Sequence, residues 1–94
     1  MTNENFIEKA KNLVFEYACE HMDKAELGIT FDEGVIAFNV FVVWDAYILG
    51  NIKALLSTTL HDGMYYEVTY NKAKNEVYFD AYKKVENRKI DLPA

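Results

Sequence analysis

The side chains best suited to metal or acid–base chemistry are few in this sequence. Cys19 is the only cysteine, and His21 and His61 are the only histidines. Zinc sites need clustered Cys and His ligands at short, fixed spacings. Cys19 and His21 lie two residues apart in a helical pattern and therefore point to different sides, and His61 is far along the chain. We therefore predict no zinc site, no other metal centre and no cofactor.

Hydroxyl groups gather near one imidazole, in the residues Ser57, Thr58, Thr59 and His61. No other part of the sequence brings serine or threonine hydroxyls so close to a histidine. In a strand, Ser57 and His61 would stand about 13 Å apart, which is too far for a hydrogen bond. The sequence also holds no Gly-x-Ser-x-Gly elbow. We therefore predict that the protein is not an enzyme.

The elements that must position these residues are one helix and four strands. Apolar residues recur at steps of three and four over residues 3–22, which predicts an amphipathic helix. Beyond Val35, β-branched and aromatic residues dominate between turn signals. They predict an antiparallel meander of strands at about 38–49, 52–60, 64–71 and 76–80. The expected fold is α+β, a single domain over residues 1–94 with the N-terminal helix packed on the sheet.

The C-terminal segment has two interpretations. Asp80 either ends a strand or caps a short C-terminal helix over residues 81–88, and the basic residues near the end of that segment favour the helix. In the strand alternative Asp80 would face Glu67, and two opposed carboxylates raise each other's pKa or hold a cation. We favour the helix, with Glu67 solvated.

Side-chain alternation divides the predicted sheet into two faces. We assume two-residue loops at Gly50-Asn51 and Asp62-Gly63 and a four-residue loop at 72–75. One apolar face then packs on the helix: Val42, Trp44, Ala46, Ile48, Leu55, Thr59, Tyr66, Val68, Tyr70, Val77 and Phe79. The opposite face, which includes Ile52 and Ala54, is too apolar in its first two strands for a surface that meets only water.

This second, outward-pointing face is the predicted binding surface. Tyrosine combines a large apolar area with a polar tip and is enriched at interfaces. The candidate binding residues are Phe41, Asp45, Tyr47, Leu56, Tyr65, Glu67 and Tyr78. The alternative is that they lie under the C-terminal segment. We also expect a homo-oligomer, a dimer through the same face, because a two-fold dimer hides an apolar patch.

The charge balance narrows the class of partner. Fifteen acidic residues against ten basic ones give a net charge of −5, and Arg88 is the only arginine, so we predict no nucleic-acid binding. The first half of the chain carries most of the negative charge, an asymmetry that can orient a partner. The longest apolar stretch, residues 35–49, is too short and too β-branched for a membrane helix. A single cysteine without a secretion signal is typical of a cytoplasmic protein.

Most of the chain resembles a known family. The residues that carry the likeness are Phe6-Ile7-Glu8-Lys9-Ala10-Lys11, Val42-Val43-Trp44, and the runs Lys53 to Leu60, Asp62 to Asn71 and Asp80 to Asn87. They resemble an uncharacterised family of small bacteriophage and prophage proteins of Gram-positive hosts, a domain of unknown function. The resemblance implies a phage accessory protein that acts in the bacterial cytoplasm, and it supplies no catalytic residues.

From these observations we consider three possible functions, in order of preference. The leading hypothesis is a non-catalytic protein that binds a host or phage protein, in host takeover or counter-defence, through the outward-pointing face. The second is an oligomeric binder of a small, nucleotide-like signal, with Lys53, Lys72 and Arg88 as candidate anion contacts. A metal-dependent enzyme ranks third.

Overall fold

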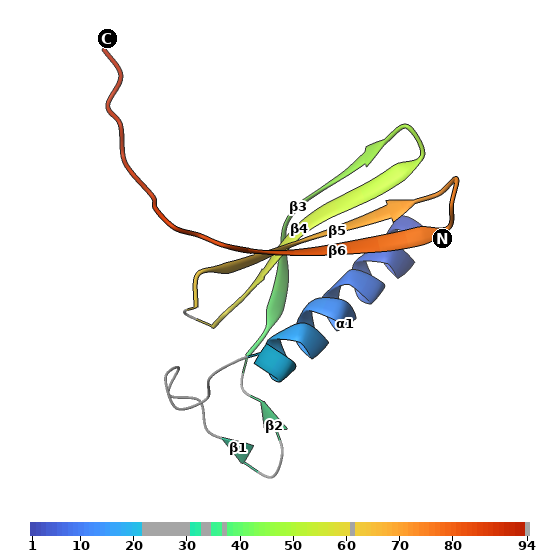
Figure 1. Cartoon of the computed structure of the whole chain (residues 1–94), viewed down its shortest axis with the longest axis horizontal. Helices are drawn as coiled ribbons and strands as arrows, with labels where there is room; N and C mark the ends of the chain where they lie inside the picture. Colours follow the sequence, from blue (N-terminus) through green and yellow to red (C-terminus); the bar gives the residue numbers. More distant parts are fainter. Residues whose placement is uncertain (22–30, 33–34, 37, 61, 94) are drawn as a thin grey trace.

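The computed structural model describes residues 1–21, 31–32, 35–36, 38–60 and 62–93. Its elements are, in chain order, α1 (Asn3–His21), β1 (Phe31–Asp32), β2 (Val35–Ile36), β3 (Val40–Ile48), β4 (Asn51–Thr58), β5 (Met64–Asn71) and β6 (Glu76–Lys83). The last four strands form one antiparallel sheet in the order β3-β4-β5-β6, and β1 pairs with β2. Figure 1 shows α1 lying across one side of the large sheet. The predicted α+β fold, an N-terminal helix on a four-stranded meander, is confirmed.

The helix α1 begins at a polar cap and packs through one narrow stripe. Thr2 Oγ1 accepts a hydrogen bond from the N–H of Asn5 at 3.1 Å, and the Thr2 carbonyl accepts one from the N–H of Phe6 at 3.0 Å. The first bond satisfies a donor that the first turn leaves without a backbone partner, and the second is the first backbone bond of the helix. The buried residues of the stripe recur every four positions: Phe6, Ala10, Val14 and Ala18.

The core lies between this stripe and the facing side of the sheet. The buried strand residues are Ile52, Ala54, Leu56, Tyr66, Val68 and Tyr70, with Val77 and Phe79 packed against them. The Tyr66 ring meets the Tyr17 ring of α1 edge-on, with 5.6 Å between centroids, a favourable aromatic arrangement. On β5 and β6 the predicted inner residues are therefore confirmed.

The face assignment of β4 is the reverse of the prediction. The residues buried against α1 are Ile52, Ala54 and Leu56, whereas Leu55 pairs with Glu67 on the other side. The prediction assumed a two-residue loop at 62–63, but β4 ends at Thr58 and β5 begins at Met64. Because side chains alternate with a period of two, a connection longer by an odd number of residues inverts every side chain of the strand.

A β-bulge at Val43 exchanges the two faces of β3, so that the side chains beyond it point to the sides opposite to those predicted. Val42 pairs with Leu56, whereas Trp44 pairs with Leu55, so two residues of β3 span one step of β4. Val42 faces α1 as predicted. The prediction is wrong beyond the bulge, where the outward-pointing residues are Trp44, Ala46 and Ile48 and the helix-side residues are Asp45 and Tyr47.

The β3–β4 hairpin turns at Leu49 and Gly50, one residue earlier than predicted. Their φ angles are 51° and 82°, and two-residue hairpins of this kind need positive φ at both positions. Glycine adopts such angles without strain, whereas leucine does so only at a cost. Leu49 is 96% exposed, so it makes no packing contact that compensates for this cost.

The strand β6 continues through Lys83, and the predicted helix over residues 81–88 is wrong. Residues 84–93 have no regular secondary structure and are exposed. The Lys84 N–H donates to the Gly63 carbonyl at 2.7 Å, which extends the β5–β6 ladder past the last strand residue. In Figure 1 the tail leaves the sheet instead of crossing it. The C-terminal segment therefore does not cover the candidate binding surface.

Candidate functional site

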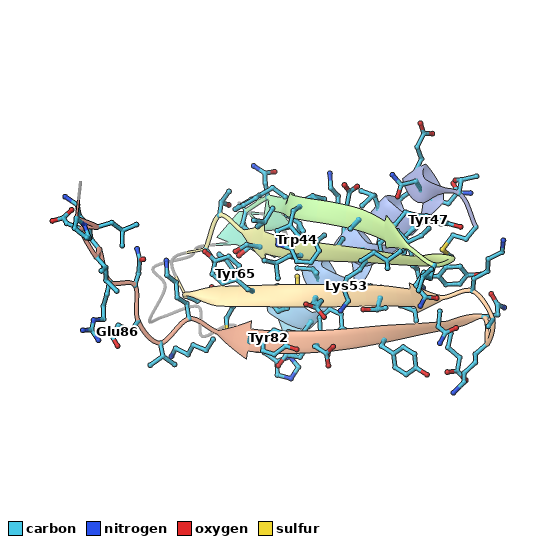
Figure 2. All side chains as sticks on the ribbon, turned by 90° about the horizontal axis from the view of Figure 1, so that it is seen from above. Trp44, Tyr47, Lys53, Tyr65, Tyr82 and Glu86 are labelled. Atoms are coloured by element: carbon cyan, nitrogen blue, oxygen red, sulfur yellow. The ribbon has the colours of Figure 1, made fainter. Side chains whose placement is uncertain are left out.

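The candidate site is the outward face, the side of the large sheet that points away from α1. Strand pairing arranges it in three rows: Phe41, Ser57, Tyr65 and Tyr82; Trp44, Leu55, Glu67 and Asp80; Ala46, Lys53, Thr69 and Tyr78. Figure 2 looks on to the sheet with α1 behind it, and Trp44, Tyr65, Lys53 and Tyr82 spread over the strands. No described segment crosses this face.

Aromatic rings make the outward face apolar while leaving it open. Four of them keep about half of their surface exposed: Phe41 (44%), Trp44 (43%), Tyr78 (46%) and Tyr82 (51%). Tyr65 and Leu55, in the middle strands, are partly buried. Single exposed apolar residues are common on soluble proteins, but a contiguous patch of them marks an interaction surface.

A charged centre interrupts the aromatic rows. Lys53 Nζ lies 3.0 Å from Glu67 Oε1, and the hydrogen bond to Glu67, helped by the attraction between the charges, raises the pKa of Lys53. Asp80 pairs with Glu67 across β5 and β6 and adds a weaker attraction to Lys53. The strand alternative for Asp80 is thus the correct one. Two carboxylates face one ammonium group, so the centre carries a net negative charge.

A second polar pair lies at one end of β6. The Tyr78 hydroxyl donates a hydrogen bond to the Glu76 carboxylate, and this bond, with a smaller contribution from burial, raises the pKa of Tyr78. The carboxylate acceptor holds the tyrosine in its neutral form, since ionisation would place two negative charges side by side. Tyr78 therefore offers a ring face and carries no charge near neutral pH.

The hydroxyl groups that the sequence singled out bond to the backbone. Ser57 Oγ donates to a carbonyl oxygen at 2.9 Å. Thr58 Oγ1 accepts from an N–H at 3.2 Å, and Thr59 Oγ1 accepts from another at 2.9 Å. His61 lies outside the described residues. Each of the three hydroxyls thus forms a hydrogen bond with a backbone group near the end of β4.

Metal ligands do not gather in the described part of the chain. None of its groups of His, Cys, Asp and Glu reaches the three members that a metal site needs. His21 Nδ1 lies 2.9 Å from the Tyr17 carbonyl, and its ring stacks on the Tyr17 ring with 3.9 Å between centroids. These contacts hold the imidazole against the last turn of α1.

The seven residues predicted to form the binding surface separate into two groups. The outward face includes Phe41, Tyr65, Glu67 and Tyr78, as predicted. The prediction for Leu56 is wrong, because the inversion of β4 buries it completely. The prediction is also wrong for Asp45 and Tyr47, because the bulge turns them to the helix side. There they line an open hollow of about 490 Å³ with Met1 and Asn3 at the start of α1.

The outward-face residues that sequence reasoning missed include Trp44, Leu55 and Tyr82. The predicted register places Trp44 and Leu55 on the helix side of the sheet, which is wrong for both residues. Tyr82 was assigned to a helix, although its spacing from Tyr78 continues the alternation of a strand and could have revealed it.

The three candidate anion contacts come from separate elements. Lys53 lies on β4 and pairs with Glu67. Lys72 lies in the β5–β6 hairpin, where its N–H donates to Asn51 Oδ1 at 3.4 Å. Arg88 lies in the tail, with its Nε 3.4 Å from a Glu86 oxygen. The described residues show no site in which these cations converge.

The fold and the outward face define the class of protein: a helix covers one side of a four-stranded meander, and the other side is an open aromatic surface. No helix of the described residues has both the length and the apolar character to span a membrane. The model of a family of unknown function, DUF6275, matches residues 7–92, so the chain belongs to that family. Neither a curated protein nor a solved structure matches the chain.

Proposed function

We propose that this protein is a small, non-catalytic accessory protein of bacteriophage origin. It works in the cytoplasm of a Gram-positive host as a homo-oligomer, and it binds a host or phage protein through its outward face, in host takeover or counter-defence. The viral origin and the location follow from the resemblance of the sequence. The binding role follows from the chemistry of the outward face.

One observation carries the proposal: the open aromatic side of the sheet. Phe41, Trp44 and Tyr82 keep nearly half of their surface exposed around the partly buried Tyr65. Aromatic residues of this kind supply most of the binding energy at protein interfaces when a partner removes them from water. A surface that only had to stay in solution would carry charged residues at these positions.

The charges of the outward face indicate the chemistry of the partner. Lys53 bonds to Glu67, and Asp80 adds a second carboxylate beside them. A partner that covers this centre must supply a cation, because a buried carboxylate without one is costly. The favoured partner is therefore a protein surface with an apolar residue that covers Trp44 and an arginine that pairs with Asp80, about 14 Å away across the sheet. The net charge of −5 would speed its approach.

Affinity capture from infected host cells tests the proposal. The immobilised protein is compared with Trp44→Ala and with Tyr47→Ala. The second variant is the matched control, because Tyr47 is a more exposed aromatic residue on the same strand but on the helix side of the sheet. We expect Trp44→Ala to lose at least tenfold of one captured protein, about 1.4 kcal/mol, and Tyr47→Ala to retain it.

The identity of the captured protein provides a second criterion. It should bind the purified protein directly, and its affinity should fall with added salt because charged groups take part. Equal capture by the wild type and Trp44→Ala would refute the outward face as the binding surface. Loss with Tyr47→Ala alone would move the site to the hollow beside α1.

A nucleotide-like ligand is the weaker alternative. Lys53, Lys72 and Arg88 lie on separate elements, and two of them already pair with carboxylates. This alternative predicts a rise in Tm on addition of a specific nucleotide, through preferential binding to the folded state. The protein-binding proposal predicts no such rise.

A further inference from the structure

The edge of the sheet at β6 is a second surface with distinct chemistry. β6 is the last strand in the order β3-β4-β5-β6, so only one of its sides has a strand partner. It is eight residues long, pairs with β5 without interruption, and contains no proline. Exposed edge strands of this kind are templates for pairing with another chain unless bulges, prolines or inward-pointing charges protect them.

The other edge strand of the sheet, β3, is protected in this way. The bulge at Val43 interrupts its ladder, and bulges bend and twist an edge so that a straight strand cannot add to it. β6 has no bulge in its register with β5. Its helix-side residues are small or apolar up to Ala81, and the first inward charge is Lys83 at the very end. A partner strand is therefore expected at β6.

The hydrogen bonds of the β5–β6 ladder show which backbone groups face outward at this edge. The Lys84 N–H donates to the Gly63 carbonyl at 2.7 Å, and these residues continue the register of Met64 with Lys83. In an antiparallel ladder, hydrogen-bonded and non-hydrogen-bonded pairs alternate. The residues that direct N–H and C=O groups toward the open edge are therefore Val77, Phe79, Ala81 and Lys83.

We infer that a second copy of this chain pairs with the open edge of β6, so that two sheets join into one antiparallel eight-stranded sheet around a two-fold axis. The pairing partner is the same strand, because β6 is complementary to itself when it is reversed. This inference rests on the edge alone and does not depend on the proposed partner of the outward face.

The charges favour one register of the paired strands over its neighbour. A two-fold axis at Asp80 would place the two Asp80 carboxylates directly opposite each other, each beside a Glu67, and like charges so placed are destabilising. An axis at Phe79 avoids this arrangement. It places Phe79 opposite its own copy and Val77 opposite Ala81, so that the half-buried edge of the core is covered by apolar side chains.

The same register is favourable on the outward side. Tyr78 then lies opposite Asp80 of the second copy, and Glu76 lies opposite Tyr82, so each carboxylate meets a tyrosine. Glu76 also lies diagonally from Lys84 of the second copy, within reach of a long side chain. The dimer leaves the outward faces uncovered and joins them into one continuous surface with two identical partner sites.

The structure offers a matched pair of variants at Ala81, which is exposed and directs its N–H toward the open edge. Ala81→Pro removes that donor and leaves the β5–β6 hydrogen bonds intact. Ala81→Val changes the side chain and keeps the N–H. In sedimentation velocity over a concentration series, we expect the wild type and Ala81→Val to dimerise and Ala81→Pro to dimerise at least tenfold more weakly.

Residue-resolved hydrogen exchange on the wild-type chain tests the same inference without a mutation. The N–H groups of Phe79 and Ala81 should exchange slowly at high concentration and quickly after dilution. Those of Tyr78 and Asp80, which face β5, should exchange slowly at both. A chain that stays monomeric at high concentration would overturn the inference. So would a dimer in which the Ala81 N–H still exchanges quickly, because another surface would then hold it together. The Trp44→Ala variant tests the outward face separately, because it leaves the backbone of β6 unchanged.

Discussion

Two neighbouring leucines of β4 give the sharpest test of the sheet register. Leu56 is fully buried in the core, whereas Leu55 lies on the outward face and is partly exposed. Leu→Ala at a fully buried site costs about 2–5 kcal/mol, the sum of lost burial and the cavity left behind. The same change at a partly exposed site should cost about 1 kcal/mol or less. Because both substitutions are identical and lie in one strand, differences in intrinsic strand propensity largely cancel.

The measurement is urea unfolding of the wild type, Leu56→Ala and Leu55→Ala. A chain of this size has a free energy of unfolding of about 5–14 kcal/mol, so a loss of about 3 kcal/mol in Leu56→Ala is a large part of it. It should lower Tm by roughly 12–24 °C. Equal losses in the two variants, or a larger loss in Leu55→Ala, would refute the register and with it the composition of the outward face.

Two further predictions concern the core and the first hairpin. Burial, with smaller contributions from Asp62 and Tyr17, raises the pKa of Tyr66 to about 12 from its ordinary value of 10. The folded state therefore keeps a proton that the unfolded chain releases, and stability present below pH 10 should fall by up to about 2.7 kcal/mol toward pH 12. Urea unfolding across this range should show a smaller fall in Tyr66→Phe, and an equal fall would contradict the assignment. Leu49→Asn should raise the free energy of unfolding by about 0.5–1 kcal/mol, because asparagine tolerates the positive φ of the turn; a decrease in thermal stability would show that the turn has another geometry.

The parts of the fold that could be predicted from the sequence are those with local signals. The stripe of Phe6, Ala10 and Val14 has helical spacing, and the burial of these residues follows from it. The predicted four-residue loop between β5 and β6 is confirmed, and the predicted faces of Tyr66 and Phe79 are confirmed with it. In both cases residues close in sequence determine the structure.

The wrong face assignments depend on whether a connection has an odd or an even number of residues, and no local sequence signal determines that number. The Asp62-Gly63 pair is a strong hairpin signal, yet the connection between β4 and β5 is longer than two residues. An error of one residue in the length of this connection exchanges the predicted faces of Leu55 and Leu56. The bulge at Val43 is equally hidden, because a run of β-branched and aromatic residues suits a regular strand and a bulged one alike.

The predicted tail helix failed because tertiary pairing outweighed weak local preferences. Ala81 and Val85 have helical spacing, and basic residues follow them. An isolated helix of this length is marginal in water, however, and the segment has no apolar face to pack on the core. Pairing with β5 offers the backbone a hydrogen-bonded partner through Lys84, whose N–H bonds to Gly63. The chain therefore stays extended until the ladder ends.

The two proposed surfaces are compatible because they use different groups of the same strand. Tyr82 and Asp80 contribute side chains to the outward face, while the backbone of Phe79 and Ala81 faces the open edge. If two copies pair through that edge, the acidic centres built on Glu67 and Asp80 lie on one continuous sheet. The two Asp80 residues are then diagonal neighbours on adjacent strands, and the two Glu67 residues lie three strand spacings apart. A partner with two basic sites could then bind both centres at once, and tethering would strengthen the second contact without any new interaction. Weak individual contacts at Trp44 would in that case suffice for tight binding. The β6 edge, which contacts only the second copy, would then raise the affinity of the outward face for its partner.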